Sequence, residues 1–380
     1  MKWIHTGDLH IGKTVNNFSM IEDQKAVLHE MVELARDQGV QAFVIAGDVY
    51  DRAVPTAEAV TVMNAFLDEL KTLDIPVFII SGNHDSPQRL EFAKKILERQ
   101  SVYIAGTFKD KLKQITLQDE FGDIVFTMMP FVKSAMLFVS TSQEAVKTML
   151  ATTGDMRNQK TRNVLITHYF VTNAGISPEL SDSETGASVG GLDNVDASLF
   201  KGFDYVALGH IHKMQRMDKA DKAEPVVNYA GAPIAYSFSE CSQEKSVTLV
   251  NMKEKGTIEL TQLPLHPIHK MRKIKGKLEQ LIMPETAKLA DTEDYIQVTL
   301  TNEEELIDPM NTLRTVYPNI MQLLFEKHER GNIDDIGVLQ DIQNMTTQEL
   351  FSDFYTTIRE TEMDDKRKKI MEQILLEMEP

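Results

Sequence analysis

The stretch Trp3-Ile4-His5-Thr6-Gly7-Asp8-Leu9-His10 opens the chain with a short apolar run that ends in an Asp-x-His motif. Four further polar motifs along the chain also follow apolar runs. They are Gly47-Asp48, Gly82-Asn83-His84-Asp85, Thr167-His168 and Gly209-His210-x-His212. Open α/β sheets bind their ligands at the carboxyl ends of strands, so polar residues directly after strands are typical of this class. We therefore expect an α/β fold.

Strand and helix patterns alternate between the first three motifs. Apolar residues at helical spacing predict a helix over residues 21–36, which Gly39 ends, and Pro55 is expected to open a second helix. Short apolar runs predict buried strands at residues 42–46 and 77–80. This part of the chain therefore predicts one parallel sheet with helices.

Strand patterns dominate between residues 110 and 264, which predicts a second sheet. Loops are expected at residues 174–191 and 213–225, which are rich in Ser, Gly, Asp and Lys. The composition changes near Pro264, and a β-α-β pattern then predicts a small α+β domain. It consists of residues 271–282 and 295–300, a helix near 303–316, and residues 320–325.

A capping-box signal at Thr346 and Glu349 opens an apolar stripe at helical spacing, and a second stripe follows a charged break. The residues on these stripes that we expect to bind a partner are Leu350, Phe351, Phe354, Tyr355, Ile358, Ile370 and Ile374. The expected domains are a main α/β domain (1–265), a small α+β domain (266–330), a linker (331–345) and a helical tail (346–380).

The 380 residues carry a formal net charge of −17, whereas proteins that bind DNA normally present a basic surface. A partner is therefore expected to supply positive surface if the substrate is nucleic acid; otherwise the acidity only aids solubility. The single cysteine, Cys241, precludes an internal disulfide. We find neither a signal-peptide pattern nor an apolar run long enough to span a bilayer, so we expect a cytoplasmic protein without membrane contact.

The five motifs together supply ligands for two divalent metal ions. The expected ligands are Asp8, His10 and His212 for the first ion, Asn83, His168 and His210 for the second, and Asp48 as the bridge. Mixed carboxylate, amide and imidazole ligands suit a borderline ion such as manganese. A pair of such ions predicts that water is activated for attack on a phosphate ester.

Three further residues are candidates for catalysis. His84 is expected to protonate or stabilise the leaving oxygen, and Asp85 is expected to orient His84 through a hydrogen bond. Arg52 is expected to contact a phosphate or to brace the loop that carries Asp48, and Asp51 to hydrogen-bond a ligand from behind. Each motif alone is also compatible with a turn or a structural histidine, so it is their combination that indicates a metal centre.

These motifs resemble those of the calcineurin-like metallophosphoesterase superfamily, which run Asp-x-His, Gly-Asp-x-x-Asp-Arg, Gly-Asn-His-Asp, Gly-His and Gly-His-x-His. Thr167 stands where the superfamily has glycine, and the expected ligand His168 is kept. Several stretches look like the nuclease branch. They are residues 8–13, 181–184, 203–213 and 229–240. The resemblance implies a four-layer α/β/β/α sandwich with a capping domain and C-terminal helices.

The same resemblance implies manganese-dependent 3′–5′ exonuclease activity on double-stranded DNA and endonuclease activity on hairpins. It also implies a partner ATPase with a long coiled coil, and a homodimer of this chain within a heterotetramer. The tail helices would dock on the base of the coiled coil, or they would pack back on this chain. Apolar faces within residues 15–70 are candidates for dimer contacts, although core packing explains them equally well.

Two other classes of function are compatible with some of these features. One is a phosphatase or phosphodiesterase that acts on nucleotides or phosphoproteins with the same metals. The other is a non-catalytic scaffold that has kept the fold. The domains after residue 270 favour the nuclease, because a small substrate needs neither a cap nor a helical tail. The complete motif set argues against a scaffold.

Overall fold

A computed structural model describes residues 1–154, 161–184, 193–218, 225–304 and 306–326, and in the tail residues 351–352, 355–356, 366–368 and 370–371. The chain divides into two compact units, Met1–Glu326 and Lys327–Pro380. No helix within these described ranges has the length and apolar character needed to cross a membrane.

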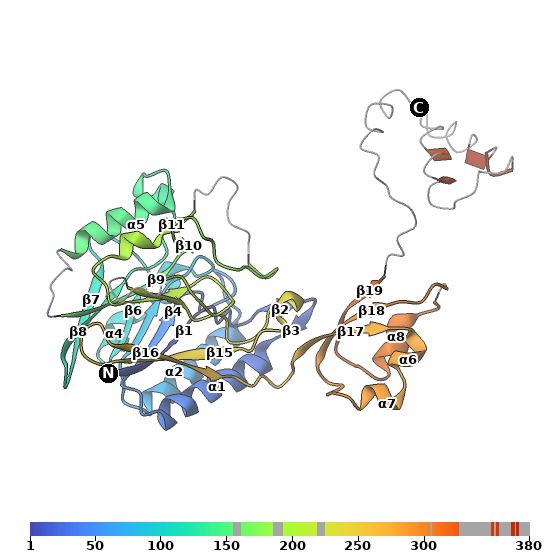
Figure 1. Ribbon diagram of the computed structural model, residues 1–380, viewed down its shortest axis with the longest axis horizontal. Helices are drawn as coiled ribbons and strands as arrows, with labels where there is room; N and C mark the ends of the chain where they lie inside the picture. The colour runs from blue at the N-terminus through green and yellow to red at the C-terminus, as the bar shows by residue number, and fades with distance from the viewer. Residues whose placement is uncertain are drawn as a thin grey trace. The chain divides into compact units, whose positions relative to one another are not determined.

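The first sheet of the larger unit has six strands in the order β16-β15-β1-β4-β5-β6 (Figure 1). Their bounds are β1 (Lys2–Thr6), β4 (Ala42–Ala46), β5 (Val77–Ile80), β6 (Val102–Ala105), β15 (Ser246–Met252) and β16 (Ile258–Pro264). Neighbours from β1 to β6 are parallel, and β15 and β16 join as antiparallel strands. Every residue of β4 and β5 is buried, which explains their unbroken apolar runs.

The second sheet also has six strands, in the order β13-β14-β12-β9-β8-β7. Their bounds are β7 (Lys113–Asp119), β8 (Gly122–Met128), β9 (Arg162–His168), β12 (Tyr205–Gly209), β13 (Gln215–Arg216) and β14 (Val226–Tyr229). The expectation of a second sheet is therefore confirmed. The expectation of a continuous loop over residues 213–225 is wrong, because β13 pairs there with β14 at the edge of the sheet.

The two sheets pack face to face through an apolar core. The Trp3 ring of the first sheet meets Phe126 and Tyr205 of the second at centroid distances of 5.4 and 5.8 Å, and Phe78 stacks on Phe126 at 4.5 Å. Helices cover the outer faces: α1 (Ile21–Asp37) and α2 (Ala57–Lys71) lie on the first sheet, and α5 (Ser142–Leu150) lies on the second. The expected α/β class is confirmed.

Helix α1 has the expected position, and Gly39 follows it with a left-handed backbone (φ 59°). Helix α2 begins later than expected, because Thr56 rather than Pro55 marks its start. The Thr56 side chain accepts a hydrogen bond from the Ala59 N–H (3.2 Å), which caps the helix. The apolar faces of both helices are buried against the first sheet, so core packing accounts for them and a dimer contact is not required.

A third, three-stranded sheet follows the two large ones and has its own apolar core. It comprises the parallel strands β17 (Met271–Gly276), β18 (Tyr295–Leu300) and β19 (Ile320–Phe325), with α6 (Leu278–Leu281), α7 (Pro284–Ala287) and α8 (Pro309–Arg314). Helix α8 is shorter than the expected helix near 303–316, because Pro309 lies in its first turn. The Tyr295 hydroxyl donates to Asp23 of α1 over 2.8 Å, which ties this sheet to the larger core.

Short elements complete the larger unit. They include β2 (Thr14–Val15), β3 (Phe18–Ser19), α3 (Pro87–Leu90), α4 (Lys94–Glu98), β10 (Val171–Thr172) and β11 (Val195–Asp196). In the tail, the side chains of Phe351 and Ile370 are exposed and that of Tyr355 is half-buried. The linker at 331–345 and four residues of the expected stripes lie outside the described residues. Those four are Leu350, Phe354, Ile358 and Ile374.

A buried ion pair at one end of the sheets predicts a stability effect. Arg162 is 1% exposed and donates to both carboxylate oxygens of Asp119 and to the Gly122 and Lys253 carbonyls. We expect Arg162→Ala to lower the free energy of unfolding by about 1–3 kcal/mol, because the Gly122 and Lys253 carbonyls lose their donor and Asp119 keeps only the Met1 amino group as a cationic partner. Urea unfolding followed by circular dichroism measures this. An unchanged unfolding midpoint would contradict it.

Candidate metal centre

The five polar motifs meet where strands of both sheets end. Asp8, Asp48 and Asn83 follow β1, β4 and β5 of the first sheet, whereas His168 ends β9 and His210 follows β12 of the second. Strands β9 and β12 are parallel and in register, with Gly209 opposite His168. Because the sheets pack face to face, the carboxyl ends of these five strands meet at one edge.

The backbone at this edge adopts a conformation that is uncommon outside glycine. Asp8, His10, Asp48 and His210 have positive φ angles of 52°, 43°, 47° and 97°. Backbone hydrogen bonds hold the loops together: the Asp8 N–H donates to Gly47 O (3.1 Å) and the His10 N–H to Asp48 O (3.0 Å). Strained backbone of this kind is concentrated at functional sites, where the surrounding structure maintains it.

The glycines of the motifs are required by close packing around the candidate ligand side chains. A Cβ atom on Gly82 would lie 2.1 Å from Asp48 Oδ1, and one on Gly209 would lie 2.0 Å from Ala46 O and 2.8 Å from His168 Nδ1. These distances are far below van der Waals contact. The Gly-Asn-His-Asp and Gly-His motifs therefore need glycine because another loop occupies the space.

Asp8, His10 and His212 form one group with metal-binding geometry. One ligand atom from each lies within 4.8 Å of the others, and the Nε2 atoms of His10 and His212 are 3.2 Å apart. Asp8, Asp48 and His168 form a second such group, with His168 Nε2 3.3 Å from Asp48 Oδ2. The same Asp48 oxygen is 3.7 Å from His10 Nε2, so it lies between the two groups.

Asn83 and His210 adjoin the second group. The Asn83 Oδ1 atom is 3.0 Å from His168 Nε2 and 3.0 Å from His210 Nδ1. The His210 N–H donates to both oxygens of Asp8, at 2.9 and 3.0 Å. The structure thus brings together all seven side chains that the sequence nominated as ligands, although Asp8 belongs to the first motif along the chain and His212 to the last.

The charges of this cluster fit divalent cations. Asp8 and Asp48 are buried, and within the described ranges of the chain their ion pairs are with histidines only, at His10 and His168. Burial raises the pKa of Asp8 to about 6. Burial also raises the pKa of Asp48, but His168 and His10 outweigh it and hold that pKa well below its usual range. Two buried carboxylates without lysine or arginine favour cations between them.

The tautomer of His168 also fits a ligand. Its Nδ1 lies 2.8 Å from the Ala46 carbonyl oxygen, which only accepts, so Nδ1 carries a proton and Nε2, which faces Asp48, is the atom that can bind a metal. Burial lowers the pKa of His168, but Asp48 and Asp8 outweigh this effect and raise it to about 9. A metal ion would therefore displace a proton from this imidazole.

His84 and Asp85 have different surroundings from those expected. The His84 Nδ1 lies 2.9 Å from Asp51 O, so the Asp51 carbonyl orients the ring. The Asp85 carboxylate instead accepts hydrogen bonds from the N–H groups of Val49 (3.1 Å), Tyr50 (3.0 Å) and Gly82 (2.9 Å). The expectation that Asp85 orients His84 is therefore wrong. Asp85 holds the two loops that carry Asp48 and Asn83.

His84 itself lies at the rim of the cluster. It is half-buried, its ring centroid is 4.8 Å from that of His10, and its ligand atom also groups with those of His10 and Asp48. The Arg52 side chain is 77% exposed, and its Nε atom is 3.5 Å from Asp51 Oδ2. Arg52 therefore faces solvent rather than bracing the Asp48 loop from within. Asp51 also lies 3.7 Å from His10 Nδ1.

Sequence reasoning missed the side chains that surround His212. Ser183 Oγ is 2.7 Å from His212 Nδ1, and the buried Glu240 accepts from that serine over 2.6 Å. Burial raises the pKa of Glu240, but His212 and Lys245 outweigh it and hold this pKa well below its usual range. The stretches 181–184 and 229–240 stand out in the sequence only by their resemblance, because no spacing rule links a serine to a glutamate 57 residues away.

Comparison with known proteins agrees with this geometry. Residues 1–214 match the calcineurin-like phosphoesterase family, and residues 267–358 match the type 5 capsule protein repressor C-terminal domain. The SbcD subunit of nuclease SbcCD from Staphylococcus saprophyticus is 30% identical, and the match covers 99% of this chain and 98% of that protein. The chain belongs to the SbcD family. It is a metal-dependent phosphodiester hydrolase, and the expected nuclease class is confirmed.

A second SbcD, from Staphylococcus epidermidis, is also 30% identical, over 92% of this chain and 95% of its own length. Among solved structures, TT1561 of Thermus thermophilus matches with a TM-score of 0.43 at 12% identity, covering 69% of this chain and 98% of that one. A dimetal phosphatase from Danio rerio matches with a TM-score of 0.41 at 10% identity, covering 70% of this chain and 99% of that one.

The packing of Gly82 generates a prediction. We expect Gly82→Ala to displace the Asp48 carboxylate and to weaken metal binding roughly tenfold or more, the scale at which disturbed ligand surroundings act. Metal content after dialysis against dilute manganese measures the effect. Gly39→Ala is the control, because open space surrounds that glycine and its positive φ makes the substitution strain the backbone away from the site, with no clash against a candidate ligand. Equal metal content in all three proteins would contradict the prediction.

Proposed function

We propose that this chain is the nuclease subunit of an SbcCD-type complex. In this proposal it degrades double-stranded DNA as a 3′–5′ exonuclease, cuts hairpins as an endonuclease, and serves DNA repair, recombination and replication. The observation that carries the proposal is the convergence of two buried carboxylates and several imidazole nitrogens on one sheet edge. The two staphylococcal SbcD relatives, matched over almost the whole chain and named as nuclease components, support it further.

In this proposal the seven converging side chains would hold two divalent ions, which in the cell would be manganese, and Asp48 would contribute to both sites because it lies between the two groups. A set of oxygen and imidazole ligands suits manganese better than a set of thiolate ligands does. When bound, such a pair of ions stabilises negative charge on phosphoryl oxygens and makes water a stronger nucleophile. The buried carboxylates of Asp8 and Asp48 and the lone pair of His168 Nε2 provide the negative and polar surroundings that this requires.

The remaining site residues act on the DNA in this proposal. His84 donates its Nδ1–H to the Asp51 carbonyl, which leaves Nε2 to hold a proton and to deliver it to the leaving oxygen. The exposed guanidinium of Arg52 contacts a backbone phosphate. Asp85 keeps the loops of Asp48 and Asn83 in place through three backbone N–H groups.

A nuclease assay with Mn²⁺ tests the proposal. We expect the purified protein to degrade duplex DNA and to cut hairpin DNA. We expect His84→Ala to lose about 10²–10⁴-fold in rate, the usual contribution of general acid catalysis, while metal analysis still finds two ions per chain. His29→Ala is the matched control, because His29 lies exposed on α1 and pairs with Glu69.

Other outcomes of this assay would redirect the proposal. Loss of metal from His84→Ala would make His84 a ligand, in keeping with its position beside His10 and Asp48. Turnover of small phosphate esters without cleavage of DNA would favour a phosphatase or phosphodiesterase. Failure to take up metal would reject the enzymatic proposal altogether.

For the rest of the chain we propose a main nuclease domain (1–265), a capping domain (266–330), a linker (331–345) and a tail (346–380) that binds an SbcC-type ATPase. We further propose that two copies of this chain join two copies of the ATPase in a heterotetramer. The net charge of −17 supports a division of labour in which the partner supplies basic surface for DNA. The exposed apolar side chains of Phe351 and Ile370 support helix-in-groove docking of the tail.

Deletion of residues 346–380 tests the role of the tail. We expect the shortened chain to keep its metal content and its nuclease activity on hairpin DNA, but to lose co-purification with the partner ATPase. Ile370→Asp is expected to weaken association in the full chain, because it places a charge in an apolar contact, whereas Lys368→Ala serves as the neighbouring control. Undiminished co-purification of the shortened chain would show that the tail serves another purpose.

A further inference from the structure

His212 is held by other side chains at three of its atoms. Its backbone N–H donates to Glu184, and its carbonyl oxygen accepts from Lys245 Nζ over 3.1 Å. Its Nδ1 atom lies 2.7 Å from Ser183 Oγ, on the side of the ring opposite the Nε2 atom that faces His10. Hydrogen bonds of this kind determine the orientation and the tautomer of a histidine that binds a metal.

Glu240 lies behind Ser183 and is fully buried, at 0% exposure. Its Oε1 atom accepts hydrogen bonds from Ser183 Oγ (2.6 Å), Ser237 Oγ (3.1 Å), Ser181 Oγ (3.3 Å) and the Tyr236 N–H (3.3 Å). A carboxylate with so many donors around one oxygen is ionised and can only accept. The shortest of these contacts is the one with Ser183.

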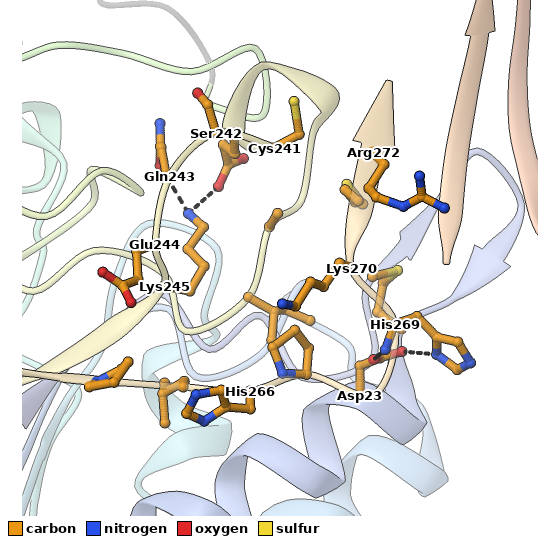
Figure 2. A pocket seen from close by; sticks show the side chains of 18 residues that line it. Asp23, Cys241, Ser242, Gln243, Glu244, Lys245, His266, His269, Lys270 and Arg272 are labelled. Carbon is orange, nitrogen blue, oxygen red and sulfur yellow. Dashed lines mark hydrogen bonds and ion pairs between the residues drawn. The ribbon is translucent and has the colours of Figure 1, made fainter. Parts of the chain in front are cut away.

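Lys245 supplies the positive charge that Glu240 needs in its buried position. Its ammonium group lies 2.5 Å from Glu240 Oε2 and 3.2 Å from Gln243 Oε1. Figure 2 shows Lys245 turned toward Gln243 at the wall of a cavity of about 500 Å³, which Glu240 also lines. Lys245 also donates a hydrogen bond to the His212 carbonyl oxygen. Its ammonium group therefore links the buried Glu240 carboxylate to the backbone of His212.

The direction of the serine proton follows from these contacts. Ser183 has a single hydroxyl proton, and its nearest acceptor is the Glu240 carboxylate, which has no proton to give. With that proton donated to Glu240, Ser183 Oγ can only accept from His212. His212 must then carry its proton on Nδ1, and its Nε2 lone pair is directed toward the group that contains Asp8 and His10.

We propose that Ser183 and Glu240 are positioning residues that fix the Nδ1–H tautomer of His212 and thereby prepare its Nε2 atom to bind metal. The inference rests on the proposed function, because it takes His212 as a ligand. It adds two residues, outside the seven ligands, on which the affinity of the first ion depends.

The test measures Mn²⁺ affinity of the full chain by isothermal titration calorimetry. We expect Ser183→Ala to weaken binding about 10–100-fold, the usual effect of removing a hydrogen-bond partner of a ligand histidine. Glu240→Gln is expected to act in the same direction. In this variant the amide oxygen faces Lys245, so the NH₂ group faces Ser183 and donates to its Oγ atom. Ser183 then donates its own proton to His212 Nδ1, and the proton of the neutral His212 ring moves to Nε2. Ser183→Thr keeps the hydroxyl and is expected to restore binding to within a few-fold of the parent chain.

Ser237→Ala is the matched control, because Ser237 also donates to Glu240 Oε1, whereas its other side-chain contact is Ser239 Oγ (2.6 Å) and not His212. We expect it to change Mn²⁺ affinity by less than a few-fold. In parallel, ¹⁵N spectra of histidine-labelled, metal-free protein report the tautomer, with His212→Asn identifying the signals. We expect a protonated Nδ1 at His212 in the parent chain and a shift toward protonated Nε2 in Glu240→Gln.

The outcomes separate this inference from the proposed function. If His212→Asn leaves metal binding unchanged, the ligand assignment itself fails. If His212→Asn weakens binding while folded Ser183→Ala binds Mn²⁺ as tightly as the parent chain, only the positioning role is overturned. An equal loss in Ser237→Ala and Ser183→Ala would also overturn it, because the effect would then come from a general disturbance around Glu240.

Discussion

The burial of two carboxylates, Asp8 and Asp48, beside each other is the constraint on which the rest of the site depends. Ionised carboxylates are costly to remove from water, and in the part of the chain that the structure describes they are paired with histidines alone. The apolar contacts between the two sheets, centred on Trp3, Phe78 and Phe126, offset this cost and hold the strand ends together. The strained backbone at the ligands follows from the same constraint.

Local sequence patterns predicted the large elements well, because their determinants lie within a few residues. The apolar spacing of α1 and the continuous apolar runs of β4 and β5 each identify an element without reference to the rest of the fold. The predictions that were wrong concerned features set by competition between neighbouring residues or by partners far away in the sequence. Thr56 caps α2 although Pro55 looked like its first residue, and β13 exists only because β14 is beside it.

The candidate metal ligands could be nominated from the sequence because metal chemistry restricts the residue types and each motif follows a strand. The residues that support these ligands could not, since their partners come from other parts of the chain. Asp85 adjoins His84 in sequence, yet it accepts hydrogen bonds from the backbone N–H groups of Val49 and Tyr50 in another loop. Ser183 and Glu240 are separated by 57 residues, and their common function appears only when both are placed around His212.

The pairing of the first strand with one of the last has a consequence for how the enzyme is made. Trp3 of β1 lies opposite Val250 of β15, and the ligand set extends from Asp8 to His212. A ribosome that has produced only residues 1–190 has completed neither sheet, because β12 to β16 are still missing, and it has made neither His210 nor His212. The partly synthesised polypeptide thus lacks part of the side-chain cluster, and the first strand must wait for its partner β15 until late in synthesis.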